Sequence, residues 1–395
     1  MPLRKLAGHA RAVSEVPRDL LLGRYPEFVT GGALPRGHIP VFVFHSVEPE
    51  GFGHKLRYLA DNGYVTLSAE EYYHVLMGAR PAPDRAVVLT FDDGRGSIYG
   101  VAYPLMRRLG MKGIVFLVPG RMASRPGPLA PTWDDVRAGG TKAEAVLARE
   151  SGDGAFLCWE EVEALAPSGL FDFQSHTWAH ARVHSAPHLA GFLTPELQRG
   201  YQAMDVPLLH EGARDLLAGE APLGTPLFRS EPRTSEALRF FEEPSLRRAC
   251  VEAVAEGGGE GFFYRRGWER TLRSVLRPMH LTGRVETPEE RERAIRCELE
   301  AAKSAIEART GRPVVHLCYP WHVSGPTARR LAREVGYRTA LCGKVTGVTV
   351  TLPGGDPQAI ARIGEDYVEL LPGRGRADLL SILRRKWSRR LRGGP

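Results

Sequence analysis

Two groups of polar residues stand where hydrophobic runs of strand length end. Asp92 and Asp93 come directly after AVVLTF, and His176 and His180 follow FDFQS. Carboxylate and imidazole side chains bind metals, and two histidines with one carboxylate form the open three-ligand set of catalytic zinc or non-haem iron sites. One of the two carboxylates can then bind the metal while the other acts on a water molecule. The residue types therefore predict a metal site with an adjacent carboxylate.

The spacing within each group sets a geometric requirement. Alternate residues of a strand point in opposite directions, so Asp92 and Asp93 can face one site only if the following glycine bends the second carboxylate inward. His176 and His180 share a face if Ser175 caps a helical turn. Simpler interpretations stay open. Asp-Asp-Gly is a common turn signal, and the histidine spacing, which continues to positions 184 and 188, also fits a polar face or an adventitious metal patch.

The elements that must position these groups follow an alternating pattern. Hydrophobic runs of strand length alternate with stretches of helical period, which is typical of βα units with parallel strands, so the fold class is α/β. The expected strands are 39–45, 86–91, 113–118, 169–174, 313–318 and 337–341, and the expected helices are 98–109, 159–166, 289–309 and 326–335.

In a closed parallel barrel the strand ends that carry these residues meet at one rim, where active sites are built. His45 ends the first expected strand, and Tyr319 to His322 follow VVHLC. Four separate segments thus deliver polar groups to the same rim. This agreement in chain order favours a site over a set of unrelated turns.

The regular alternation breaks for roughly a hundred residues, which is far longer than an ordinary connection. We interpret this stretch as an inserted, mainly helical subdomain or lid, with helices expected near 195–217 and 235–255. The expected division of the chain is an N-terminal extension (1–38), the first part of a barrel (39–186), the insertion (187–286), the second part of the barrel (287–373) and a basic C-terminal helix or tail (374–395).

Charge and cysteine content exclude some classes of function. The net charge is +7, and residues 374–395 hold eight basic residues against one acidic residue, so residues 1–373 are formally neutral. A neutral body argues against a basic nucleic-acid groove. The five cysteines are odd in number and contain no C-x-x-C pair, which predicts neither a disulfide framework nor a cysteine zinc site. With no signal-peptide pattern at the N-terminus, we expect a cytoplasmic protein.

Two long stretches, VVLTFDDGRGSIYGVAYPLMRRLGMKGIVFLVPG and LCWEEVEALAPSGLFDFQSHTWAH, resemble the polysaccharide deacetylase family, also called the NodB-homology or family-4 carbohydrate esterase group. TFDDG and SHTxxH are its most specific motifs. The resemblance implies a distorted (β/α) barrel with one divalent metal, usually zinc, held by Asp93, His176 and His180. It also implies that Asp92 is the general base.

The sequence departs from the family pattern in its third and last motifs. Cys318 stands where the family has an arginine that orients the base, and we expect Arg362 to take over that role. Trp321 keeps a backbone N–H that can serve as an oxyanion donor, and Tyr319 is assigned to substrate contact or orientation. The late histidine that supplies a general acid is missing, so His322 or His45 is expected to substitute.

These features predict a metal-dependent N-deacetylase that hydrolyses the acetamide of an N-acetylated amino sugar in a glycan, glycoside or lipid-linked precursor. One alternative is hydrolysis of another non-peptide C–N bond, such as a formamide or ureide. A second is a non-catalytic, metal-binding carbohydrate-recognition protein. The C-terminal helix carries leucines and a tryptophan on one side and arginines opposite. It either packs on the barrel or contacts an anionic membrane.

Overall fold

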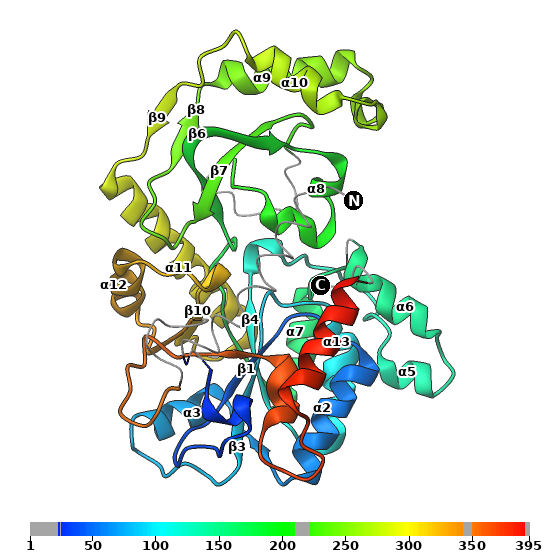
Figure 1. Ribbon diagram of the computed structural model, residues 1–395, viewed down its shortest axis with the longest axis vertical. Coiled ribbons are helices and arrows are strands. Elements are labelled where there is room, and N and C mark those ends of the chain that lie inside the picture. The colour runs from blue at the N-terminus through cyan, green and yellow to red at the C-terminus, as the bar shows by residue number, and fades with distance from the viewer. Residues whose placement is uncertain (1–22, 24, 153, 210–220, 343–349, 392–395) are drawn as a thin grey trace.

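The protein was analysed as a computed structural model, which describes residues 23, 25–152, 154–209, 221–342 and 350–391. Figure 1 shows two parts, a sheet surrounded by helices in the lower half and a smaller inserted part in the upper half. The long helix α11 (Pro288–Thr310) starts beneath the inserted part and runs down along the sheet. The expected α/β class is confirmed.

The main sheet is parallel throughout. Its strand order is β11-β10-β5-β4-β3-β1-β12, and β2 pairs with β3 beside this path. All six residues of β3 are buried, because both faces of a parallel sheet are covered. The strands are β1 (Val41–Phe44), β2 (Val65–Thr66), β3 (Ala86–Phe91), β4 (Gly113–Leu117), β5 (Phe171–Ser175), β10 (His316–Cys318), β11 (Thr339–Leu341) and β12 (Ile363–Gly364).

The sheet closes into a distorted barrel through a short segment before and within β12. Ile360 forms a parallel bridge with Leu341 of β11, and Ile363 and Gly364 pair with β1 on the other side. Residues 360–364 therefore join the two edges of the sheet. Closure brings the carboxyl ends of β1, β3, β5 and β10 to one rim, as a parallel barrel requires.

The surrounding helices begin and end at ordinary capping signals. In α11, the Thr287 side chain accepts a hydrogen bond from the amide of Glu290 in a capping box, and Gly311 ends the helix with a φ of 64°. The other helices beside the sheet are α2 (Pro49–Asp61), α3 (Ala69–Leu76), α4 (Tyr103–Leu109), α5 (Trp133–Arg137), α6 (Ala143–Leu147), α7 (Trp159–Leu165), α12 (Pro326–Val335) and α13 (Leu379–Leu391).

The inserted part contains more helix than strand, as expected, but its strands were not expected. Two antiparallel pairs, β6 (Arg182–Phe192) with β7 (Pro226–Pro232) and β8 (Phe240–Glu242) with β9 (Gly283–Val285), accompany α8 (Pro195–Gln198), α9 (Pro244–Glu256) and α10 (Trp268–Leu276). The antiparallel pairing starts at Arg182, five residues before the expected boundary. The part has an apolar core of its own, formed by Phe192, Phe228, Phe240, Leu246, Cys250, Val254, Phe262, Leu272 and Leu276.

Both helices expected in the insertion are shorter than predicted. The stretch 195–217 forms α8 and a 3₁₀ segment, η6 (Gly200–Asp205), while residues 210–220 lie outside the described part of the chain. The stretch 235–255 becomes helical only at Pro244, because Phe240–Glu242 pair with β9. Proline at the first helical position fixes that start.

The ends of the described chain pack against the barrel. The segment η1 (Glu27–Thr30) buries Phe28 and Val29 in the main core. Arg376, before α13, donates hydrogen bonds to the backbone carbonyls of Phe28, Gly31 and Gly32. Among the described residues, none of the helices combines the length and the apolar character needed to cross a bilayer.

Candidate metal centre

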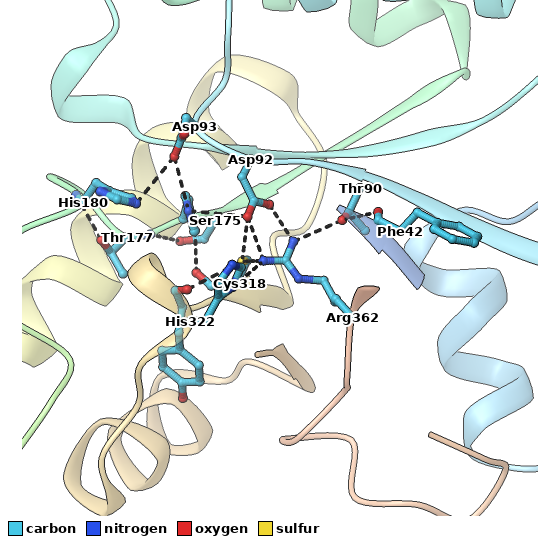
Figure 2. Close-up of polar contacts among 12 residues, drawn as sticks. Phe42, Thr90, Asp92, Asp93, Ser175, Thr177, His180, Cys318, His322 and Arg362 are labelled. Atoms are coloured by element: carbon cyan, nitrogen blue, oxygen red, sulfur yellow. Dashed lines mark hydrogen bonds and ion pairs between the residues drawn. The ribbon is translucent and has the colours of Figure 1, made fainter. Parts of the chain in front are cut away.

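The rim of the barrel gathers the predicted residues from five strand ends. Asp92 and Asp93 follow β3, and His176 and His180 follow β5. In Figure 2, Asp93 points toward His180, while Asp92 points toward Arg362 and Cys318. His45 follows β1, His322 follows β10, and Arg362 directly precedes β12. Arg362 and Asp92, which are 270 residues apart in sequence, therefore meet at this rim.

Asp93, His176 and His180 form a compact group whose side-chain atoms could hold a metal ion. Asp93 Oδ1 lies 3.5 Å from the Nε2 atom of each histidine, and all three side chains are buried. Tetrahedral zinc with bonds of about 2.0–2.1 Å separates neighbouring ligand atoms by roughly 3.4 Å. Asp93 Oδ1 is buried without a hydrogen-bond partner among the described residues. The spacing and the orphaned oxygen both fit a divalent cation between the three side chains.

The tautomer of His176 also suits metal binding. Its Nδ1 atom lies 2.7 Å from the backbone carbonyl oxygen of Cys318, which has no proton to give. Nδ1 therefore carries the hydrogen, and in the neutral ring the Nε2 lone pair faces Asp93. A carbonyl in this position is a typical outer partner of a metal-binding histidine, because it fixes both ring orientation and tautomer.

The two histidines meet without the expected helical turn, so that prediction is wrong. Ser175 is the last residue of β5, and residues 176–180 form a loop. Thr177 and His180 have φ values of 63° and 53°. The Ser175 hydroxyl accepts a hydrogen bond from the Thr177 amide, and the Thr177 hydroxyl accepts one from the His180 amide. These local bonds offer the backbone an alternative to a helix.

Positive φ values concentrate at this rim. Of the six non-glycine residues with positive φ among the described residues, five are Asp93, Thr177, His180, Trp321 and His322. A left-handed conformation costs a non-glycine residue on the order of 1–3 kcal/mol, and such residues cluster at functional sites. The φ of 68° at Asp93 turns the second carboxylate into the site. The turn thus begins at Asp93 itself, one residue before the expected glycine.

Asp92 is held by Arg362, as the sequence predicts. The guanidinium donates through Nη1 to Oδ1 and through Nη2 to Oδ2, each at 2.7 Å. Nη1 also donates to the Thr90 hydroxyl, which in turn donates to the Phe42 carbonyl. Burial alone would raise the pKa of Asp92, but the charges of Arg362 and His176 hold it well below its usual value. Asp92 is therefore an oriented, ionised carboxylate.

A second cluster of possible ligand atoms, Asp92, His176 and Cys318, overlaps the first. The Arg362 Nη2 atom lies 2.9 Å from Cys318 Sγ and also binds Asp92. A cation already occupies the space between two of these three groups. Like charges repel strongly in a buried site, so the set around Asp93 is the better metal site.

Neighbouring charges, rather than burial, separate the protonation behaviour of the two histidines. Burial lowers the pKa of His180 to about 3, so this ring is neutral and ready to bind a metal. Burial acts in the same direction on His176, but the neighbouring Cys318 and Asp92 raise its pKa well above the usual value. Its proton and a metal therefore compete for Nε2.

The two candidate acids differ in their surroundings. His322 Nδ1 lies 3.3 Å from Arg362 Nη2. Desolvation of the ring, followed by the charge of Arg362, lowers the pKa of His322 to about 4. His45 is exposed at the end of β1, next to Phe44, whose carbonyl accepts the Asp92 amide. Its charge, when present, acts on both Asp92 and Asp93.

Of two further predicted residues, Trp321 lies beside the site and Tyr319 lies in the core. The ring of Trp321 lies 4.8 Å from that of His180, and the guanidinium of Arg182 lies 4.9 Å from the Trp321 ring. The side chain of Tyr319 is fully buried, and its hydroxyl donates to the Ala328 carbonyl. Tyr319 is therefore a core residue, and its predicted contact with substrate is wrong, because the apolar side chains under the rim enclose its ring.

Sequence reasoning missed one residue at the site. Tyr201, in η6 of the inserted part, donates from its hydroxyl to Asp93 Oδ2 at 3.0 Å. It lies 108 residues after Asp93, in a stretch with no motif of its own. The only available signal was the insertion itself, since a lid contributes side chains to the site it covers.

Comparison with known proteins agrees with this geometry. The family model described as polysaccharide deacetylase matches residues 79–204, which include both aspartates and both histidines of the metal site. This stretch of the chain is therefore similar to the polysaccharide deacetylase family. Arg362, His322 and His45 lie outside the matched residues.

Two curated relatives resemble part of the chain. The poly-beta-1,6-N-acetyl-D-glucosamine N-deacetylase of Escherichia coli (strain K12) is 29% identical over 135 residues, which cover 34% of this chain and 18% of the relative. YxkH of Bacillus subtilis (strain 168), named as a polysaccharide deacetylase, is 31% identical over 88 residues, which cover 20% of this chain and 32% of the relative. The chain thus spans less than a third of either relative.

One solved structure shows the same fold. A de-N-acetylase from Aggregatibacter actinomycetemcomitans aligns with a TM-score of 0.51 at 16% identity, covering 88% of this chain and 99% of that structure. At this identity the similarity concerns the fold only, and it confirms the expected deacetylase-type (β/α) barrel.

Proposed function

We propose that this protein is a metal-dependent N-deacetylase that hydrolyses the acetamide of an N-acetylated amino sugar. The observation that carries the proposal is the pairing of an ionised, oriented carboxylate with a three-ligand metal set. Asp92 is fixed through both oxygens by Arg362, and its Oδ2 lies 4.0 Å from Nε2 of the ligand His176. A base beside a metal position is what hydrolysis of an amide requires.

The metal we propose is zinc, held by Asp93, His176 and His180. When bound, zinc would lower the pKa of a water molecule and polarise the acetyl carbonyl. Asp92 accepts a proton from the attacking water, because its carboxylate is ionised and points at the site. The backbone N–H of Trp321 is assigned to the oxyanion that forms at the carbonyl carbon. Cleavage of the C–N bond then gives acetate and an amine.

The departing amine needs a proton, and we assign its supply to His45. His322 faces the guanidinium of Arg362, which opposes a positively charged ring. His45 stands at the end of the strand next to Asp92 and is exposed to solvent. Histidine is the most common general acid in enzymes that work at neutral pH.

The non-catalytic alternative loses its main motivation. It rested on the missing late histidine and on the replacement of the family's arginine by Cys318, which would leave Asp92 without an orienting partner. Arg362 supplies that partner from another strand, with Nη2 between Cys318 Sγ and Asp92. Hydrolysis of another C–N bond stays an alternative, because the residues around the metal would serve a formamide equally well.

The test is hydrolysis by wild type and Asp92→Asn. The substrates are N-acetylated sugars, oligomers of poly-β-1,6-N-acetyl-D-glucosamine and lipid-linked sugars, with acetate as the readout. Removal of the base should reduce turnover at least 100-fold with metal content unchanged. Asp84→Asn, at an exposed carboxylate before β3, is the matched control. Equal activity of Asp92→Asn and wild type would contradict the proposal, and formate release without acetate release would favour the alternative bond.

We also propose a peripheral contact of α13 with an anionic membrane, which would hold the enzyme near a lipid-linked substrate. Leu380 and Trp387 are 66% and 55% exposed, and Arg384 and Arg385 are exposed beside them. Apolar and cationic side chains together favour anionic lipid surfaces. A cytoplasmic location stays a prediction from the sequence.

A further inference from the structure

Asp93 is shared between the barrel and the inserted part. Its Oδ1 atom faces the two histidines at 3.5 Å. Its Oδ2 atom accepts the hydrogen bond from the Tyr201 hydroxyl at 3.0 Å. The two oxygens of one ligand carboxylate therefore have different partners, and one of these partners comes from outside the barrel.

The ring of Tyr201 is held independently of its hydroxyl. The Arg95 guanidinium lies 4.0 Å from the centroid of the ring, and the ring of Phe156 lies 6.3 Å away. Arg95 is itself fixed, since its Nε atom donates to Glu150 at 2.9 Å and to the Ser46 hydroxyl at 3.1 Å. A phenylalanine at position 201 would keep these ring contacts and lose only the hydrogen bond to Asp93.

The backbone around Tyr201 is docked on the rim of the barrel. Met204, in the same 3₁₀ segment, is buried in a small apolar cluster with Val118, Ala155 and Phe156. The buried Arg121 donates through Nη2 to the Ala203 carbonyl at 3.2 Å. The position of the Tyr201 hydroxyl is therefore set by how η6 packs against the barrel.

We propose that Tyr201 is a positioning residue of the metal centre, through which the inserted part sets metal affinity. With Oδ2 bound to the tyrosine, Asp93 offers the metal one oxygen and leaves the remaining coordination positions for water and substrate. Outer partners of this kind fix ligand orientation, and their loss typically costs 10–100-fold in metal affinity or activity. This inference rests on the metal site of the proposed function.

The test is the zinc affinity of Tyr201→Phe, measured by competition with a chromophoric chelator on the full chain. We expect affinity 10–100-fold weaker than in wild type, with an unchanged thermal unfolding midpoint of the metal-free protein. Tyr264→Phe is the matched control, because this tyrosine is also in the inserted part but is 82% exposed. Its zinc affinity should equal that of wild type.

A second measurement uses the visible absorption of the Co²⁺-loaded protein, which weakens when the coordination number rises. Freed from Tyr201, Asp93 Oδ2 can join the metal, so Tyr201→Phe should absorb more weakly than wild type. Zinc affinity within twofold of wild type, with an unchanged cobalt spectrum, would overturn the inference while leaving the proposed function intact. Failure of wild type itself to bind zinc would instead overturn the proposed function.

Discussion

Arg362 separates the roles of the two histidines that the sequence leaves as candidate acids. It lies 3.3 Å from His322 Nδ1, and its positive charge disfavours a second cation there. A ring with a pKa of about 4 is neutral at pH 7 and has no surplus proton to give. His45 is exposed at the neighbouring strand end, where it can exchange protons with solvent.

We predict that His45→Ala lowers kcat at least 100-fold, because general acid catalysis contributes about 10²–10⁴-fold. His322→Ala should lower kcat less than tenfold, since the neutral ring gives no proton in the reaction. Steady-state acetate release at saturating zinc measures both effects. His54→Ala, at a 61% exposed side chain on α2, is the control. The reverse order of the two losses would assign the acid to His322.

At the residue level, the chemistry of the site is largely predictable. The motifs TFDDG and SHTWAH contain the carboxylate and imidazole side chains, and each motif lies at the end of an expected strand. The role of Arg362 is also predictable. With Cys318 in place of the family's arginine, Asp92 needs another basic residue to orient it, and Arg362 lies next to a late hydrophobic segment of the chain. The backbone conformation of His176–His180 could not be predicted from the sequence. Its path depends on hydrogen bonds from Ser175 and Thr177 and on contacts with α11, such as the Ala179 amide donating to Glu298.

At the level of elements, α13 has two apolar sides. Ile382 is buried against the barrel core with Leu379 packed beside it, and Lys386 pairs with Asp366 at 2.9 Å. Leu380 and Trp387 lie on the other side with the exposed Arg384. Packing on the barrel and contact with a membrane are therefore compatible, because Ile382 and Leu379 face the barrel while Leu380 and Trp387 are exposed.

We predict that the full chain floats with anionic liposomes and not with neutral ones, because exposed arginines accompany the two apolar side chains. The double variant Leu380→Ser, Trp387→Ser should lose at least half of the bound fraction. Leu352→Ser, at a 39% exposed leucine outside α13, serves as the control. Equal binding to neutral and anionic vesicles would remove the lipid contact.

Element boundaries are best predicted where local signals decide them. The expected strand 86–91 and helix 326–335 coincide with β3 and α12, since a buried β-branched run and a proline-to-glycine span mark their ends. The strands of the inserted part were not foreseen. β8 and β9 are three residues long and 43 residues apart, and only their pairing makes them strands.

At the scale of the whole molecule, buried histidines connect stability to pH. His38 precedes β1 and is buried in the folded chain, and burial lowers its pKa from 6.5 to about 4. The unfolded chain therefore binds a proton between these pH values that the folded chain refuses. Stability present above pH 6.5 is lost as the pH falls toward 4, by about 3 kcal/mol from this residue.

We predict that the free energy of unfolding of the metal-free protein declines less steeply between pH 6.5 and 4 in His38→Gln than in wild type. Urea unfolding at a series of pH values gives this slope, whatever the absolute stability of the variant. His280→Gln, at an exposed histidine, should keep the wild-type slope. An unchanged slope in His38→Gln would contradict the assigned burial effect.

The barrel brings Asp93 and the two histidines that follow β5 close to Asp92 and Arg362, around the metal position that we propose. The most direct measurement is acetate release from an N-acetylglucosamine oligomer by the full chain, as purified, after metal removal by a chelator, and after stepwise return of zinc. We predict loss of activity on removal and full recovery at about one zinc per chain, with no recovery in Asp93→Ala. Activity that survives metal removal, or recovery in Asp93→Ala equal to wild type, would contradict the metal centre assigned to Asp93, His176 and His180.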